Sequence, residues 1–244
     1  MPLPNPDNIL RIRRASPTRL ESFVDAAFAF AITLVVISVG HLPTSVPDML
    51  QALRGVPTFA LCFFMIARIW SRHRAWSLHY DLEDGYTLRL SLLLVFLVLV
   101  YVYPLRLLLS IMMDSLSGGV LVEQPVVVHE IWELRAAYVV FGIGYAGIAL
   151  VFVALYRHTL RVADGIGLDA AERLVTRMTE MRWCGVLVVA VFSAVLACVL
   201  PFDAGTAWMA SIPGFAYWLL FFNVALLRRR YSARLAGLDT AAAV

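Results

Sequence analysis

Residues 19–37 read RLESFVDAAFAFAITLVVI, and this stretch decides the fold of the chain. After Asp25, only Thr33 interrupts a run of apolar side chains. The apolar segment over 20–40 has about the 20 residues that a helix needs to cross the hydrocarbon core of a bilayer. An aspartate is costly inside lipid unless it is paired or solvated, which places Asp25 near an interface. We therefore expect a transmembrane helix over residues 20–40.

Five further apolar segments of similar length follow the first one. The whole chain of 244 residues is 61% hydrophobic and 15% charged, whereas soluble domains carry about 25% charged residues. A soluble protein of this size has no single core that hides so much apolar surface, so lipid must cover part of it. The sequence thus predicts an all-α membrane protein with six transmembrane helices. The further segments cover residues 49–70, 86–113, 134–156, 183–200 and 206–227.

The placement of arginine predicts the orientation of these helices. All 20 basic residues are arginine, and only Arg54, Arg106 and Arg135 fall on the side opposite to the rest. Because cytoplasmic loops carry the excess of basic residues, both termini are expected in the cytoplasm, which requires an even number of crossings. We expect a multi-pass protein of the cell's inner (plasma) membrane. Its expected divisions are a cytoplasmic N-terminal segment over 1–18, a six-helix transmembrane domain over 19–230 and a cytoplasmic tail over 231–244.

The sequence lacks the motifs of catalysis and cofactor binding. It has no glycine-rich phosphate loop, no nucleophile elbow and no pair of carboxylates inside an apolar segment. The three cysteines lack the spacing of a metal or disulfide framework, and the polar residues after the second segment match no metal signature. We therefore expect no enzyme activity, no cofactor, no metal site and no nucleic-acid partner, and we expect membrane lipid around the chain.

Helical periodicity gives the first segment one distinctive face. At about 100° per residue, one stripe is shared by Ala26, Phe30, Thr33, Leu34 and Ile37. Several copies of this stripe around one axis would line a narrow pore with apolar side chains and one hydroxyl group. Such a stripe is also typical of ordinary packing between helices, so periodicity alone leaves both interpretations open.

Ten residues of the first two segments fit a known pattern. The pattern is Arg-x-x-x-Phe-Ser-Asp, then Phe-Ala-x-Ala-x-Thr-Leu, with Trp-x-x-His at the cytoplasmic end of the second helix. The matching residues are Arg19, Phe23, Asp25, Phe28, Ala29, Ala31, Thr33, Leu34, Trp70 and His73. In these residues, and in its six-segment layout and length, the chain resembles the transmembrane protein 175 family. That family comprises potassium channels of endolysosomes and their single-repeat bacterial relatives.

The resemblance implies a homotetramer in which the first helix of each subunit lines one central pore. It implies a constriction made of the large apolar side chains of Phe30, Leu34 and Ile37, without a filter of backbone carbonyl groups. The hydroxyl group of Thr33 would replace part of the water shell of a permeating potassium ion. The resemblance further implies a structural polar network near the cytoplasmic side. The members of that network are Arg19, Phe23, Asp25, Trp70 and His73.

The chain departs from the family pattern at two positions of the first helix. Val24 stands where the pattern has serine, and its side chain neither donates nor accepts a hydrogen bond. Phe30 stands where the family has isoleucine or leucine. Four phenyl rings around one axis would narrow the pore and favour its dewetting.

These observations predict a potassium-permeable cation channel, and two alternatives stay open. A small proton-coupled transporter would need acidic residues near the bilayer midplane, whereas Asp25 is expected near an interface. The second alternative is a membrane enzyme or a scaffold. An enzyme would need clustered polar residues in a cavity, for which Asp25, His73 and Arg19 are the candidates, whereas a scaffold that does not conduct ions would need no pore at all. Assembly into a tetramer with ion flux distinguishes the channel from both alternatives.

Overall fold

The regular structure of the described residues is entirely helical. The computed structural model describes residues 9–14, 16–37, 44–124, 126, 128–200 and 211–242. The helices are α1 (Arg19–Ile37), α2 (Val46–Arg54), α3 (Val56–Tyr80), α4 (Gly85–Ser117), α5 (Ile131–Arg161), α6 (Ala170–Val199), α7 (Ile212–Phe215), the short 3-10 helix η3 (Ala216–Trp218) and α8 (Leu219–Ala242).

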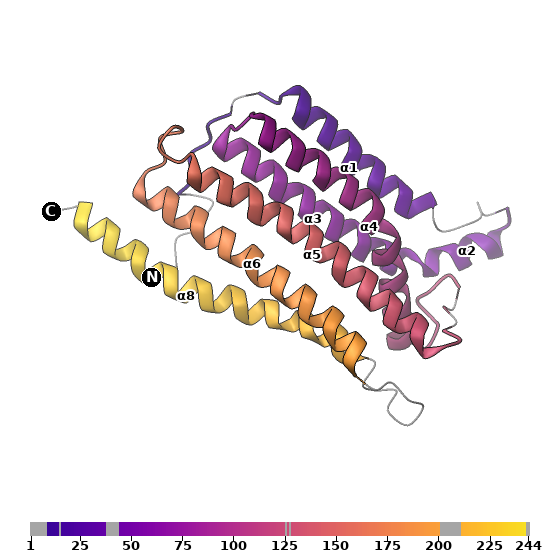
Figure 1. The fold of residues 1–244 in the computed structure, drawn as a ribbon. Helices are drawn as coiled ribbons and strands as arrows, with labels where there is room; N and C mark the ends of the chain where they lie inside the picture. Colours follow the sequence, from indigo (N-terminus) through magenta and orange to yellow (C-terminus); the bar gives the residue numbers. More distant parts are fainter. Residues whose placement is uncertain are drawn as a thin grey trace.

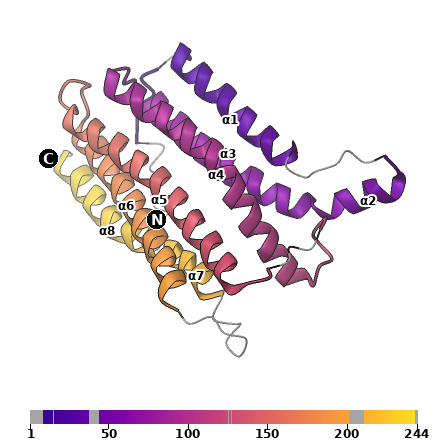
Figure 2. The ribbon, with the colours of Figure 1, turned by 45° about the vertical axis from the view of Figure 1, so that its right-hand side comes forward.

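The long helices run side by side in a slab-shaped bundle (Figure 1). Helix α1 packs against α3 and α4, α4 packs against α5, α5 against α6, and α6 against α8. Helices α1 and α8 therefore form opposite edges of the slab, as a second view also shows (Figure 2). The starts of α1, α4 and α6 and the ends of α3 and α5 lie together, and we call this end of the bundle the arginine-rich end.

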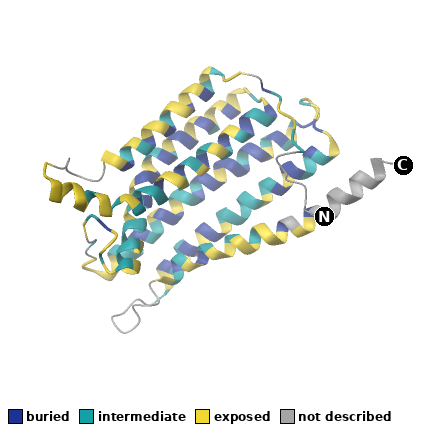
Figure 3. Ribbon diagram, turned by 180° about the vertical axis from the view of Figure 1, so that it is seen from behind, coloured by how far each residue is buried: buried dark blue, intermediate teal, exposed yellow. Residues whose placement is uncertain are grey.

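One apolar core runs through the middle of the slab, where Figure 3 shows the buried residues between exposed outer faces. Helix α1 contributes Val24, Phe28, Ala31 and Val35, whose spacing of three and four residues puts them on one face. Helices α3, α4 and α5 supply most of the rest of this core. Helix α6 adds Trp183, whose ring stacks on Phe152 of α5 with centroids 4.1 Å apart.

Four of the described helices are long and apolar enough to cross a membrane on their own, namely α1, α4, α5 and α6. A fifth crossing results when α2 and α3 are counted as one span, although they are bent by 48° where they meet. The predicted segment 49–70 treated this region as one helix. Pro57 in the first turn of α3 lacks the amide hydrogen that would continue α2, so the chain bends there, and α3 then runs on to Tyr80.

The predicted sixth segment is the one that the structure supports least. Its first part lies in residues 201–210, which are outside the described residues. Beyond them the chain forms α7, which contains Pro213, then η3 and α8. Helix α8 runs along α6 and continues to Ala242, but it is not among the described helices apolar enough for a span, because its sequence includes three consecutive arginines. The structure therefore gives four or five candidate crossings, and the sixth stays a prediction.

Candidate pore helix and its polar anchors

Helix α1 presents two different faces. Its core face is fully packed, with Phe28 only 2% exposed. The opposite face is apolar yet uncovered in the single chain, with Phe30 55% and Ile37 65% exposed. Thr33 is exposed on the same side, whereas Leu34 is partly buried and packs against the core. Three of the four residues predicted to line a pore are thus exposed at the edge of the slab, and Leu34 lies at the boundary between the two faces.

The hydroxyl group of Thr33 is committed as a donor within its own helix. It donates to the carbonyl oxygen of Ala29 at 3.0 Å. A hydroxyl group has one donor and two acceptor lone pairs, so the oxygen keeps its capacity to coordinate a cation. The bond also fixes the rotamer of Thr33 against the helix.

Two polar contacts involve residues of the predicted network. The indole nitrogen of Trp70 donates to the Asp25 carboxylate at 2.7 Å, which ties α1 to α3. The Nε2 atom of His73, which is buried, lies 3.0 Å from the hydroxyl oxygen of Ser91, which ties α3 to α4. Asp25 and His73 also line one small cavity of about 260 Å³ beside α1.

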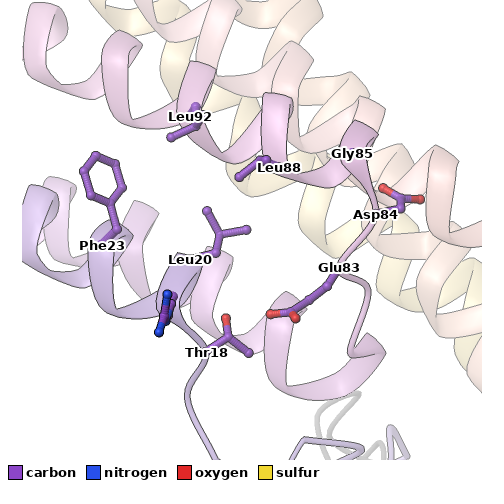
Figure 4. Close-up of a pocket in the computed structure, with 9 residues that line it drawn as sticks. Thr18, Leu20, Phe23, Glu83, Asp84, Gly85, Leu88 and Leu92 are labelled. Carbon is purple, nitrogen blue, oxygen red and sulfur yellow. The ribbon is translucent and has the colours of Figure 1, made fainter.

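The other two members of that predicted network lie on a different side of α1. Arg19 and Phe23 are exposed and line a wider groove of about 570 Å³ between α1 and α4. Figure 4 shows Phe23 and Leu92 at the apolar part of the groove and Glu83 at its polar end. The structure therefore brings Asp25, Trp70 and His73 to one region and places Arg19 and Phe23 in another.

Val24 occupies the position at which the family pattern has serine. Its side chain is 1% exposed and belongs to the apolar core. A valine suits that environment because it needs no hydrogen-bond partner there. At this position the chain therefore has apolar packing between α1 and its neighbours in place of a hydroxyl group.

The sequence alone did not predict the role of Arg14, a buried charge in this region. Its guanidinium group contacts the carboxylates of Asp81 at 2.6 Å, Glu83 at 2.9 Å and Glu21 at 3.5 Å, and its side chain is only 4% exposed. The hydrogen bonds from the Thr18 hydroxyl and from Arg14 hold the pKa of Glu83 below its ordinary value. Arg14 therefore binds carboxylates within the protein, a structural role that the positive-inside rule does not predict.

The neighbouring Arg13 holds a second buried carboxylate. It donates to Oε1 and Oε2 of Glu172 at 2.9 and 2.7 Å, and the Glu172 side chain is completely buried. Glu172 also closes a capping box with Asp169 at the start of α6. The start of α1 has the same kind of sequence pattern, Thr-x-x-Glu over residues 18–21. This spacing is typical of a capping box and could have predicted one there.

The long apolar helices, and the apolar face of α1 that no other described helix of the chain covers, are those of an all-α, multi-pass membrane protein. The profile of a family described as "Endosomal/lysosomal potassium channel TMEM175" matches residues 19–104. A potassium channel of Marivirga tractuosa is 31% identical over 214 residues, which cover 85% of this chain and 84% of the relative. The chain therefore belongs to the TMEM175 family of potassium channels, which confirms the resemblance found in the sequence.

A solved structure of the same family has a similar fold. It is the crystal structure of a variant of the potassium channel MtTMEM175 in complex with a nanobody–MBP fusion protein. The two chains share a TM-score of 0.78 and 29% identity, with 92% of this chain and 97% of the other covered. The likeness thus extends well beyond the two segments that carry the sequence pattern.

Proposed function

We propose that the protein is a potassium-permeable cation channel of the plasma membrane, with both termini in the cytoplasm. In this proposal four copies assemble around one axis, and α1 of each copy lines the pore. Phe30, Leu34 and Ile37 form the hydrophobic constriction, and Thr33 offers a hydroxyl oxygen beside it. The observation that carries the proposal is the uncovered apolar face of α1 at the edge of the slab.

The spacing of the proposed constriction suits a narrow and dry passage. Phe30 and Ile37 are two helical turns apart, so the passage is about 10 Å long at a rise of about 1.5 Å per residue. Apolar side chains over that length oppose the entry of water, and an ion then loses part of its hydration shell. A ring of Thr33 hydroxyl groups would return some of the lost oxygen contacts to a potassium ion.

The distribution of charge supports the proposed orientation. Arg13 contacts the end of α3 and the start of α6, and α8 ends toward the same side of the bundle. The positive-inside rule assigns this arginine-rich end to the cytoplasm. The Marivirga tractuosa relative, which is named a potassium channel, supports potassium as the permeant ion.

The test is ion flux through the purified protein in liposomes. Phe30→Ala is expected to raise potassium flux about tenfold, which corresponds to about 1.4 kcal/mol removed from the permeation barrier. Phe96→Ala is the matched control, because Phe96 is a 61% exposed phenylalanine on α4, outside the proposed pore. Valinomycin added at the end of each run reports the total potassium that the liposomes hold.

The outcomes separate the channel from the two alternatives. Potassium flux above that of empty liposomes, raised by the change at Phe30 and unaffected at Phe96, supports the proposal. Flux that requires a proton gradient favours a transporter. A stable protein that gives no flux, before or after the Phe30 change, favours a scaffold that does not conduct ions.

A further inference from the structure

The first described residues form a strap across the arginine-rich end of the bundle, and we call residues 11–14 the N-terminal strap. The backbone amides of Arg13 and Arg14 both donate to the carbonyl oxygen of Leu78, at 3.0 and 3.2 Å. The side chain of Arg13 reaches Glu172 at the start of α6, and that of Arg11 pairs with Asp169 at 3.3 Å. The strap therefore touches α3 and α6, helices that lie far from it in the sequence.

Arg14 extends these contacts to α1. Of its three carboxylate partners, Asp81 and Glu83 lie in the turn between α3 and α4, whereas Glu21 lies in the first turn of α1. A guanidinium group this deeply buried stays charged only with carboxylates beside it, because an uncompensated buried charge is costly. Arg14 is thus a charged link between α1 and the turn that joins its two neighbours.

The link acts on the N-terminal cap of α1. The Glu21 carboxylate accepts a hydrogen bond from the backbone amide of Thr18 at 3.1 Å. The Thr18 hydroxyl oxygen accepts one from the backbone amide of Glu21 at 3.3 Å. These two bonds form a capping box, so the position of Glu21 determines where the helix begins and how its first turn is oriented.

We infer that Arg14 is a positioning residue for the pore helix, an inference that rests on the proposed function of α1. Arg14 holds Glu21 in the first turn, and Trp70 holds Asp25 one turn further on. Two anchors at different heights fix the rotation of a helix about its own axis. Phe30 lies nine residues after Glu21, about 13 Å along the helix. These two anchors therefore set whether the Phe30 side chain points toward the axis of the proposed pore.

The primary experiment measures α1 directly and does not depend on conduction. Arg14→Gln is expected to increase amide hydrogen exchange over residues 19–30, because the first turn of α1 loses its buried charged partner. Arg11→Gln is the matched control, since Arg11 belongs to the same strap and carries the same charge but pairs in solvent with Asp169. Equal exchange over residues 19–30 in both variants overturns the inference.

The second readout is the ratio of potassium to sodium flux in liposomes. Arg14→Gln is expected to lower this ratio about threefold, and Arg11→Gln to leave it unchanged. Arg14→Lys keeps the charge and is expected to recover part of the ratio, although a lysine does not reproduce the planar guanidinium contacts. A native ratio in Arg14→Gln overturns the positioning role while the proposed channel stands.

A double-mutant cycle tests whether Arg14 acts through Glu21. Glu21→Gln removes the carboxylate charge but keeps the capping box, because glutamine also accepts the Thr18 amide hydrogen. If the link is Arg14 to Glu21, the double variant raises exchange over residues 19–30 no further than Arg14→Gln does. Additive effects of the two changes show that Arg14 does not act on α1 through Glu21. Lack of flux in the native protein contradicts the proposed function but leaves the exchange result valid.

Discussion

At the scale of single residues, the arginine-rich end is stabilised by carboxylates that must stay ionised. Glu83 accepts hydrogen bonds from the Thr18 hydroxyl and from the guanidinium group of Arg14, which lower its pKa from the ordinary value of 4.5. A carboxyl group whose pKa is lower in the folded state binds a proton more readily when unfolded. Its stabilising contribution is therefore present above pH 4.5 and is lost as the pH falls through the lower, folded-state pKa.

This contribution of Glu83 predicts a pH-dependent difference between two proteins. At pH 7, Glu83→Gln is expected to unfold at a lower temperature than the native protein in the same detergent. The gap is expected to close as the pH is lowered from about 5 toward 3, because protonated glutamate resembles glutamine. Every other titrating group is common to both proteins, so the difference isolates Glu83. A gap that stays constant over this range contradicts the assignment.

The residues of the arginine-rich end also show which contacts cannot be predicted from a single sequence. The apolar runs predicted α1, and the family pattern singled out Asp25, Trp70 and His73. No periodicity or motif pairs Arg13 with Glu172, because the two residues are 159 positions apart and meet only through the fold. By the positive-inside rule, these arginines indicated only which side of the membrane is cytoplasmic. In the structure they also form ion pairs with specific carboxylates.

At the scale of the element, α1 combines a structural face with a proposed functional face. Phe28 and Phe30 are two positions apart and therefore point in different directions, with exposures of 2% and 55%. Phe28→Ala is expected to lower the free energy of unfolding by about 3–5 kcal/mol, because it opens a cavity in the core. Phe30→Ala is expected to lower it by less than about 1 kcal/mol, as for an exposed side chain.

Unfolding of both alanine variants in matched detergent micelles measures this difference. Flux assays of the same preparations link the measurement to function, since Phe30→Ala is the variant expected to conduct more. Equal losses of stability would mean that α1 is rotated relative to the structure. That result would also remove the observation that carries the proposed pore.

Hydrophobicity located the long helices but underestimated their lengths, since α5 and α6 have 31 and 30 residues whereas the predicted segments 134–156 and 183–200 have 23 and 18. A run of apolar residues reports which part of a helix prefers lipid, but it does not report where the helix begins. Helix α3 therefore extends ten residues past the predicted end at Trp70, through polar residues that pack within the protein. The bend before Pro57 was readable from Gly55 and Pro57, which both fall inside the predicted segment 49–70.

At the scale of the whole molecule, the described helices do not determine whether the chain crosses the membrane an even number of times, as predicted. Counting α2 and α3 together gives five candidate spans, and α8 decides the sixth. Helix α8 passes along α6 and ends toward the arginine-rich end, so an even number of passes is consistent with its course (Figure 1). The proposed tetramer would complete the pore, because one uncovered face of α1 can line a pore only together with the same face of other copies.

Labelling of single cysteines in intact cells tests this topology. Two exposed positions lie at opposite ends of the bundle: Ile12 in the N-terminal strap, and Val120 just after α4. Each is replaced by cysteine in a background whose native cysteines, Cys62, Cys184 and Cys198, are replaced by alanine. A maleimide that does not cross membranes is expected to label the Val120→Cys protein from outside.

The Ile12→Cys protein is expected to react only after the cells are permeabilised, because the positive-inside rule places the strap in the cytoplasm. Flux through each cysteine variant shows that the labelled protein retains the native assembly. Labelling of Ile12→Cys from outside would reverse the orientation and place the arginine-rich end against the positive-inside rule. The buried pairs of Arg13 and Arg14 would then account for these arginines, since they are satisfied within the protein on either side of the membrane.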